Sequence, residues 1–396
     1  SAARGAYNHY PFDEVAFMLY REYGTTGLQV SAVGFGGMRF ENKNGLDYNA
    51  SLVNAAYEAG INYFDTAPGY DKSEEIFGLA FRQMRKTRAS RPFYISTKSM
   101  KKEPDGVRKD IETSLERMGL DYIDFYHLGC VMSLDDYRQR KAKGVLDEFK
   151  KLKSEGLIKH IVISTHATGP EIAQILADYP FEGVLLGYSV MNFPYRDAGL
   201  DAAARLGRAV VVMNPLGGGL ILQHPELFSF AKTNADQTVV QAALRFLLND
   251  NRITIALVGL STHEQLAEAI AAVAGFEPLD AAQVAGIRQG LSESFNQLCT
   301  SCRYCDNCPA GIPVPKLMDV YNVYVLSNDT KNTWQRMAWH WGIKSEDDPF
   351  GKCTECGACE DACTQHLPIR QRLKVLRGVI EQYESQKNKQ VKNNNP

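Results

Sequence analysis

The segment Phe93-Tyr94-Ile95-Ser96-Thr97-Lys98-Ser99 decides the fold when it is read together with the two segments that follow it. Its first residues are apolar, aromatic or β-branched, which is typical of a strand that is buried on both faces. The amphipathic segment Val107–Met118 follows and predicts a helix, and the apolar run Tyr122–Gly129 predicts a second strand. A strand, a helix and a strand in this order indicate a βαβ unit, in which the two strands lie parallel in one sheet.

The same alternation extends from Val30 to about Val273. Eight strand candidates, separated by helix-like stretches, within roughly 250 residues match the count of a (β/α)8 barrel. An open doubly wound sheet alternates in the same way, but it usually has fewer strands and a Gly-x-Gly-x-x-Gly turn, which Gly34–Gly37 does not supply. The sequence therefore predicts an α/β fold with a TIM barrel. The expected strands are Val30–Gly36, Ile61–Ala67, Phe93–Ser99, Tyr122–Gly129, Lys159–His166, Gly183–Val190, Ala209–Leu216 and Thr254–Gly259, with further helices at Leu134–Leu152 and Val239–Leu248.

Eight of the nine cysteines lie close together in the last quarter of the chain, and the ninth, Cys130, stands alone. The first run is Cys299-x-x-Cys302-x-x-Cys305-x-x-Cys308-Pro309, and the second is Cys353-x-x-Cys356-x-x-Cys359-x-x-x-Cys363. Clustered Cys-x-x-Cys spacing in a chain that is not secreted indicates metal binding rather than disulfides.

The spacing of these cysteines favours two [4Fe–4S] clusters. Three thiolates of one run grip one cluster, and the fourth cysteine of that run reaches over to the other cluster. The expected ligand sets are Cys299, Cys302, Cys305 and Cys363 for the first cluster, and Cys308, Cys353, Cys356 and Cys359 for the second. Two structural zinc sites are the alternative, but zinc sites pair two cysteine doublets and leave a third cysteine at the same step without a role. Thr364 stands where a proline usually follows the last cysteine, which removes no ligand.

The chain is expected to divide into four parts. Residues 1–19 form an N-terminal extension, 20–280 the barrel, 281–384 a mainly helical domain with the two clusters, and 385–396 a flexible tail rich in Lys, Gln and Asn. Tyr20–Arg21 and Leu28–Val30 flank a turn and predict a hairpin that closes the barrel floor. The segment Pro309–Lys352, between the two cysteine runs, is expected to be mostly helical.

The overall charge balance bears on partners and compartment. A net charge of −2 gives no reason to expect nucleic acid or an anionic membrane as a partner. No apolar run approaches the roughly 20 residues that span a bilayer. Ser1–Tyr10 contain neither a methionine nor an apolar signal core, so we expect a trimmed or processed terminus. The expected compartment is the cytoplasm, with export followed by signal removal left open.

Two expected strands end in residues that can carry chemistry. Ile61–Tyr70 contains Asp65 and Tyr70, and the next strand ends in Lys98. Residues at the carboxyl ends of barrel strands face the mouth, where TIM-barrel enzymes work. A tyrosine that donates a proton to a carbonyl needs a lowered pKa, and a lysine oriented by a carboxylate supplies it. The alternative is that Asp65 and Lys98 form a buried structural ion pair beneath the rim.

At several of these stretches the sequence resembles the aldo-keto reductases, specifically members with a C-terminal ferredoxin-like extension. The matching stretches include Thr26-Gly27-Leu28, Phe64-Asp65-Thr66-Ala67, Ser96-Thr97-Lys98, Leu120-Asp121-Tyr122-Ile123-Asp124 and Asn214-Pro215-Leu216-Gly217. The resemblance spans nearly the whole chain. It implies a barrel that binds a nicotinamide cofactor without a Rossmann fold, and a catalytic set of Asp, Tyr, Lys and His. Three of these map onto Asp65, Tyr70 and Lys98.

The family histidine would fall at Gly129, so the resemblance leaves this role open. His127, two residues earlier, points to the same face of its strand one layer deeper, and it is expected to occupy the space that Gly129 leaves. The alternative is a core histidine. His166, at the end of the fifth strand, is another candidate proton donor, and Cys130 is either a thiol facing the ligand or packing.

The cofactor positions that the resemblance implies are only partly kept. Thr165 and Leu185 replace the Asn and Gln that hold the nicotinamide amide, and Ser261 replaces the arginine that binds the 2′-phosphate of NADP. Either NAD(H) or NADP(H) is therefore expected. The expected contacts are Ser164, Tyr188, Asn214, Pro215, Leu216, Gly217, Gly259, Ser261, Gln265 and Glu268.

Together these features predict an iron–sulfur oxidoreductase that interconverts a carbonyl and an alcohol of a small molecule. A nicotinamide transfers two electrons as a hydride, each cluster takes one, and no flavin site is recognisable. The alternative is therefore an electron-transfer subunit whose barrel is a scaffold that docks a redox partner protein. In a third interpretation, the clusters only stabilise the fold of an otherwise ordinary reductase.

Overall fold

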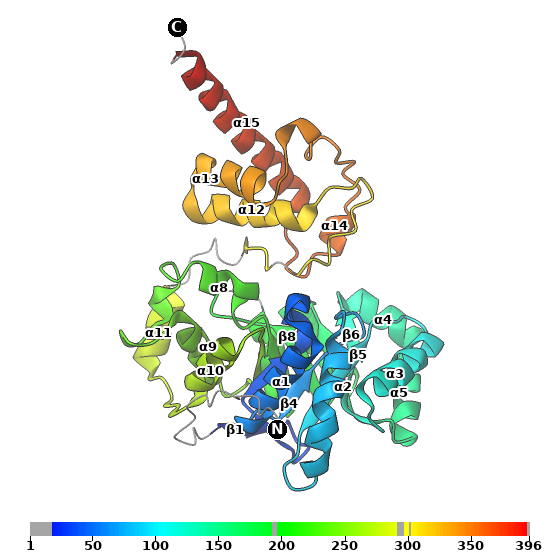
Figure 1. The fold of residues 1–396 in the computed structure, drawn as a ribbon. Helices are drawn as coiled ribbons and strands as arrows, with labels where there is room; N and C mark the ends of the chain where they lie inside the picture. Colours follow the sequence, from blue (N-terminus) through cyan, green and yellow to red (C-terminus); the bar gives the residue numbers. More distant parts are fainter. Residues whose placement is uncertain (1–17, 192–195, 291–296, 301, 394–396) are drawn as a thin grey trace, which may run out of the picture.

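The computed structural model describes residues 18–191, 196–290, 297–300 and 302–393, and a closed barrel of eight parallel strands lies at its centre (Figure 1). Around the barrel the order is β10, β3, β4, β5, β6, β7, β8 and β9, so each strand pairs with its neighbour in sequence and β10 closes the ring against β3. The predicted TIM barrel is confirmed. The strands are β3 (Val33–Gly36), β4 (Tyr63–Asp65), β5 (Tyr94–Ser99), β6 (Ile123–Val131), β7 (Ile158–Thr165), β8 (Gly183–Gly187), β9 (Ala209–Met213) and β10 (Ile255–Gly259).

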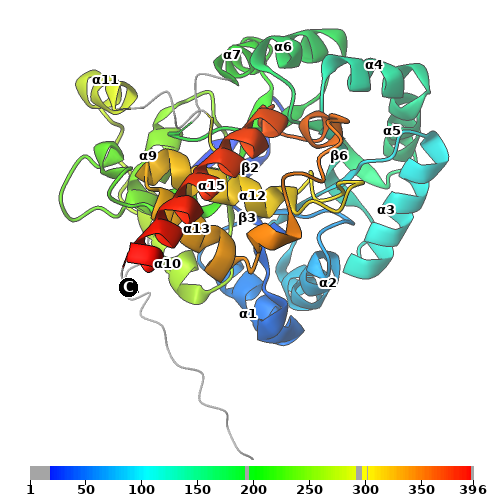
Figure 2. The same cartoon turned by 90° about the horizontal axis from the view of Figure 1, so that it is seen from above.

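Helices surround the barrel, as the view along its axis shows (Figure 2). Most of them bury an apolar face on the strands; on α2, for example, Phe77 and Phe81 pack against Phe64 of β4. The helices of this layer are α1 (Gly45–Glu58), α2 (Ser73–Met84), α3 (Pro104–Met118), α4 (Leu134–Ala142), α5 (Val145–Ser154), α6 (Gly169–Asp178), α7 (Asp197–Arg205), α9 (Val239–Asn249) and α10 (His263–Val273).

One predicted helix, Leu134–Leu152, is wrong as a single element, because the structure divides it into α4 and α5. Gly144, between them, has φ +80°, a left-handed conformation that a continuous helix cannot contain. The predicted hairpin is confirmed. β1 (Tyr20–Glu22) and β2 (Gln29–Ser31) pair antiparallel, and Tyr23 from the turn packs on Phe125 inside the barrel with ring centres 4.1 Å apart.

The C-terminal part is helical and has a core of its own, which contains Leu317, Leu376 and three of the cysteines. Figure 1 places it beyond the end of the barrel to which α8 (Leu220–Gln223) belongs. The helices of this C-terminal part are α12 (Val314–Ser327), α13 (Thr330–Gln335), α14 (Ala358–Asp361) and α15 (Ile369–Asn393). The preceding helix, α11 (Ala281–Gln289), lies beside the barrel helices in Figure 1, and its Ile287 belongs to the barrel core. None of the helices in the described ranges is both long and apolar enough to cross a bilayer.

The predicted tail, residues 385–396, begins within α15, which continues to Asn393. Leu376 and Ile380 fix the first turns of α15 in the core of the domain. Arg377 and Glu381, four residues apart, pair at 2.9 Å on its exposed side. A helix that is nucleated in this way extends outward at little cost per residue.

Candidate functional site

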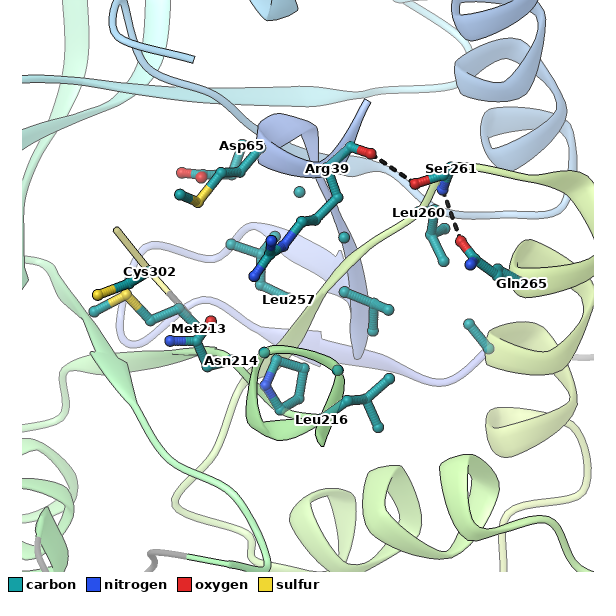
Figure 3. A pocket seen from close by; sticks show the side chains of 18 of the residues that line it. Arg39, Asp65, Met213, Asn214, Leu216, Leu257, Leu260, Ser261, Gln265 and Cys302 are labelled. Carbon is teal, nitrogen blue, oxygen red and sulfur yellow. Dashed lines mark hydrogen bonds between the residues drawn. The ribbon is translucent and has the colours of Figure 1, made fainter. Parts of the chain in front are cut away.

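A cavity of ≈ 450 Å³ lies at the carboxyl ends of the barrel strands, between the barrel and the first cysteine run. The barrel side includes Asp65 at the end of β4, Asn214 after β9 and Gly259 at the end of β10. Cys302 and Tyr304 of the first cysteine run line the cavity as well. Figure 3 shows Asp65, Asn214 and Cys302 around this space. Because TIM barrels bind their substrates at this end, the cavity is the candidate active site.

Asp65 and Lys98 form a buried ion pair beneath the cavity. Lys98 Nζ lies 3.0 Å and 2.8 Å from the two carboxylate oxygens of Asp65, and it donates a third hydrogen bond to the carbonyl oxygen of Thr66 at 2.7 Å. The same ammonium lies 4.9 Å from the centre of the Tyr70 ring. The pair is therefore buried, as the structural alternative required, and it also contacts the residue expected to donate the proton.

Tyr70 lines the cavity, and its pKa lies above its usual value rather than below it. Burial is the largest cause, followed by the negative charge of Asp65, while a hydrogen bond with the Tyr304 hydroxyl acts in the opposite direction. Since Asp65 neutralises Lys98, the lowering expected from the lysine does not occur. The phenol remains protonated at neutral pH, which is the form that a proton donor needs.

His127 is fully buried in β6 and is not among the described residues that line the cavity. Its Nε2 lies 2.9 Å from Ser96 Oγ, and that hydroxyl donates to Asp65 Oδ1 at 2.6 Å. Because the serine proton goes to Asp65, Nε2–H of the histidine donates to Ser96. Burial, and then the charge of Lys98, hold the pKa of His127 well below its usual value. The neutral imidazole of His127 thus holds Ser96 in position, and Ser96 in turn hydrogen-bonds the Asp65 carboxylate.

Gly129 does not leave the space that His127 was expected to fill. A Cβ atom at Gly129 would lie 2.8 Å from the carbonyl oxygen of Ser99 and 3.0 Å from Lys98 Cβ. Next to this position, the pairing of β6 with β7 shifts register between Leu128 and Val131. A side chain at Gly129 would require the strand to move.

His166 is the histidine that lines the cavity. It follows β7, and its ring packs edge-on against that of Tyr304, with centres 5.5 Å apart and planes at 67°. Burial, followed by the charges of Arg196 and His366, lowers the pKa of His166 to about 3. His166 therefore presents a neutral imidazole to the cavity.

Cys130 lies next to this group, in a left-handed conformation with φ +52°. Burial raises the pKa of its thiol, and a hydrogen bond with Tyr304 partly offsets that increase. Cys130 thus contacts the first cysteine run and holds no thiolate at neutral pH.

Most of the expected cofactor positions face the same cavity. They are Asn214, Pro215, Leu216, Gly259, Ser261, Gln265 and Glu268. Ser164, Tyr188 and Gly217 are not among the described lining residues, and the Tyr188 hydroxyl donates to Asp197 at 2.9 Å. The side chain of Gln265 accepts a hydrogen bond from the backbone N–H of Ser261 at 2.8 Å (Figure 3).

Arg39, which sequence reasoning missed, also lines the cavity. Its backbone oxygen accepts a hydrogen bond from Ser261 Oγ at 2.6 Å, and its guanidinium extends into the cavity (Figure 3). A Cβ atom at Gly259 would lie 2.5 Å from Arg39 Cγ, so the glycine is needed for the arginine to cross here. An isolated arginine after a strand carries no signal by which the sequence could have identified it.

The ligands expected for the second cluster surround one small cavity. Cys308 of the first run lines it together with Cys353, Cys356 and Cys359 of the second. This arrangement of four thiols around one space fits a [4Fe–4S] cluster, and it includes the expected crossover of Cys308. The four thiols surround a space, and they do not converge on one point: in the described residues, no group of three or more Cys, His, Asp or Glu side chains is arranged to bind a single metal ion.

The ligands expected for the first cluster also lie together. Cys299, Cys305 and Cys363 share one buried core. The charges of Cys302 and Cys363 reach Cys305, where they raise the pKa of its thiol after the larger effect of burial. Cys302 Sγ lies 3.3 Å from the hydroxyl of Thr364, the residue that follows Cys363. These thiols fit the second group of four that the spacing predicted.

Both segments that carry the first set of cysteines contact the barrel mouth. A Cβ atom at Gly218 would lie only 2.1 Å from the carbonyl oxygen of Thr300, so the first cysteine run rests directly on the glycine loop after β9. On the other side, Arg196 Nη2 donates to the carbonyl oxygen of Thr364 at 3.1 Å. The cysteine-rich domain thus covers the candidate active site.

Comparison with known proteins agrees with this architecture. Residues 32–291 match the Aldo/keto reductase family. The chain belongs to the aldo/keto reductase family. Residues 298–367 match the 4Fe-4S dicluster domain, so this member of the family is an oxidoreductase with an iron–sulfur domain at its C-terminal side.

Similar family members cover the barrel region. L-Galactose dehydrogenase of Arabidopsis thaliana is 29% identical over 297 residues, which are 65% of this chain and 89% of the plant protein. Among solved structures, the holo form of an aldo-keto reductase from Bacillus halodurans superimposes with a TM-score of 0.61 at 23% identity, covering 70% of this chain and 97% of the other. An aldo-keto reductase from Klebsiella pneumoniae in complex with NADPH gives a TM-score of 0.58 at 19% identity, covering 70% and 97%. These two structures share the barrel fold.

Proposed function

We propose that this aldo/keto reductase interconverts carbonyl and alcohol groups of small molecules, with NAD(H) or NADP(H) bound in the ≈ 450 Å³ cavity. One observation carries the proposal: Tyr70 and Asp65 share that cavity with Asn214 and with Gly259, Ser261 and Gln265. The proton donor and the expected nucleotide contacts therefore face one ligand-sized space. The nicotinamide, when bound, supplies or accepts the hydride.

The chain's own residues donate the proton and position the reacting groups. Tyr70, protonated at neutral pH, donates its proton to the substrate oxygen. Asp65 and the carbonyl of Thr66 fix the Lys98 ammonium against the face of the tyrosine ring, and this contact holds the phenol at the cavity.

The two histidines receive different roles. His166, neutral and on the cavity wall, orients the carbonyl by a hydrogen bond. His127 acts only through Ser96, which it holds against Asp65, and is a positioning residue. This assignment replaces the expectation that His127 itself reaches the substrate.

The eight clustered cysteines hold two [4Fe–4S] clusters in this proposal, and these supply one-electron transfer. Support comes from the matched 4Fe-4S dicluster domain and from the two groups of four thiols. We assign the protein to a reducing, cytoplasmic and anaerobic setting, because exposed thiolate ligands such as Cys356 are lost to oxidation.

A specific observation favours a second candidate function. Cys302, an expected ligand of the first cluster, lines the same cavity as Tyr70. An electron-transfer subunit would use this proximity to pass single electrons between the cluster and a ligand or a redox partner protein.

Anaerobic titration of the iron-replete protein with NADH and with NADPH separates the two candidates. Saturable binding, followed by turnover of the nucleotide when an aldehyde or ketone is added, is expected for the reductase. Absence of binding for both nucleotides, while the clusters still accept electrons from a chemical reductant, would overturn the reductase proposal in favour of the electron-transfer subunit.

A further inference from the structure

Arg372, on α15, is a fully buried cation that the protein leaves without hydrogen-bond partners. Its side chain is 2% exposed, and Nε, Nη1 and Nη2 all lack an acceptor among the residues that the structure describes. One face of the guanidinium lies over the ring of Tyr321, 4.6 Å from its centre. Among the residues that the structure describes, the two other buried arginines are satisfied: Arg140 pairs with Asp136, and Arg196 donates to backbone carbonyls.

An arginine in this state requires an acceptor. Burying a charge without a partner is strongly unfavourable, and a guanidinium cannot escape the cost by losing its proton. The aromatic contact covers one face but leaves the N–H groups at the edge unsatisfied. The missing partner must therefore be an anionic group that these edges can reach.

The groups around Arg372 identify that partner. Burial lowers the pKa of Arg372, and Tyr321, Cys299 and Cys363 lie near enough to its guanidinium to act in the opposite direction; the two cysteines are expected ligands of the first cluster. Just before α15, the backbone N–H of Leu367 donates to Cys363 Sγ at 3.4 Å. Arg372 thus lies on α15, the helix that follows the last expected ligand, Cys363, and that packs into the core containing Cys299 and Cys363.

In the described part of the chain, the second group of cysteines has no comparable buried and unpaired cation. Arg370 lines its cavity, but Arg370 Nη2 is already paired with Glu360 at 2.6 Å. Lys374, the next cation on α15, is paired with Glu355 at 2.7 Å. Carboxylates of the protein therefore balance the positive charges of Arg370 and Lys374, whereas no described side chain balances that of Arg372.

We infer that Arg372 compensates the charge of the first cluster, donating hydrogen bonds to its sulfur atoms and stabilising its reduced form. This inference rests on the cluster content given under the proposed function. Reduction adds one electron, and so one negative charge, beside a fixed buried cation. Net charge and hydrogen bonds to sulfur are among the factors that set cluster potentials. Arg372 therefore raises the midpoint potential of the first cluster.

A redox titration of the anaerobic, full-length protein, followed by the paramagnetic signal of each reduced cluster, tests this. In Arg372→Met, the equilibrium constant for reducing the first cluster should fall at least tenfold, a shift of about 59 mV for a one-electron couple. Arg372→Lys, which keeps the charge, should stay closer to the wild type than Arg372→Met does. Arg377→Met is the matched control on the same helix, because Arg377 pairs with Glu381 at the surface, and it should change neither potential.

Iron and sulfide are measured on the same samples, so that each outcome can be interpreted. An iron-replete Arg372→Met protein with unchanged potentials would overturn the inference. If Arg372→Met loses one cluster, retention of both clusters in Arg372→Lys supports charge compensation, and loss in both variants overturns it. A wild-type protein without iron would instead contradict the proposed cluster content, which keeps the two failures apart.

Discussion

Tyr304, which lies between two expected ligands of the first cluster, packs edge-on against His166 at the end of β7, with ring centres 5.5 Å apart. The cysteine-rich domain therefore supplies part of the wall of the candidate active-site cavity. We expect the barrel chemistry to depend on this domain even where no cluster electron is involved.

Removing the Tyr304 ring should consequently impair the barrel site. In Tyr304→Ala, we expect KM for the carbonyl substrate to rise at least tenfold, because one wall of the cavity is lost. Tyr304→Phe should have a smaller effect, since it keeps the ring and loses only the hydrogen bonds of the hydroxyl with Tyr70 and Cys130. Steady-state kinetics and iron content are compared with Tyr324→Phe, a tyrosine of α12. Unchanged kinetics in an iron-replete Tyr304→Ala protein would show that the wall has no role.

Tyr70→Phe should lower turnover by about 10²-fold or more, because it deletes the proton donor while leaving the ring over Lys98. Nucleotide affinity should remain within a few-fold of the wild type. Single-turnover reduction of an aldehyde and nucleotide binding are measured together. The control is Tyr48→Phe, a surface tyrosine of α1 that is 36% exposed. If Tyr70→Phe retains full turnover, the phenol does not donate the proton.

The two histidines should respond differently to truncation. His166→Ala should lower turnover by about 10²-fold with a modest change in melting temperature, because it removes a hydrogen bond to the reacting carbonyl. His127→Ala should chiefly lower the melting temperature, because it empties a fully buried position and leaves Ser96 unsupported. Turnover per folded molecule and thermal unfolding are measured on the same preparations. The reverse pattern would restore His127 as the residue that acts on the substrate.

The anaerobically purified protein should contain about eight irons and eight sulfides per chain, if both groups of four cysteines hold four-iron clusters. Cys356→Ser, at the exposed ligand of the second group, should reduce the content of the second site alone. Elemental analysis and visible absorbance give the answer. Zinc in place of iron, with no visible absorbance, would contradict the cluster proposal and favour two structural zinc sites.

Discrimination between NADPH and NADH should be weak, because Ser261 offers no guanidinium to the 2′-phosphate. Calorimetric affinities for the two nucleotides should agree within about tenfold. If NADPH instead binds about a hundredfold more tightly, Arg39→Gln should abolish the difference, since Arg39 is the cation beside Ser261. Retained preference in Arg39→Gln would require a different basic residue.

The sequence predicted the parts of this protein that depend on local spacing. Buried parallel strands such as β5 produce continuous apolar runs, and the two cysteine runs carry their ligand geometry in the intervals between residues. The break at Gly144 in the predicted helix Leu134–Leu152 was missed, because an isolated glycine within a helix-like segment does not by itself end a helix.

What the sequence could not predict depends on contacts between distant segments. That Gly129 has no space for a side chain depends on the carbonyl of Ser99 on the neighbouring strand. Arg39 and Tyr304 face the cavity only because their loops fold over it, and Arg372 stands out only because its surroundings lack an acceptor. None of these relationships has a periodicity or a motif.

The contact between Gly218 and Thr300 limits how this protein can be recombined with its relatives. At Gly218 any larger residue would meet the Thr300 carbonyl at 2.1 Å, and its φ of +70° is itself unfavourable for a side chain. A barrel from a single-domain relative with another residue at this position could not accept the iron–sulfur domain by simple fusion. Grafting experiments would have to transfer the glycine together with the domain, so the two parts are interchangeable only as a matched pair.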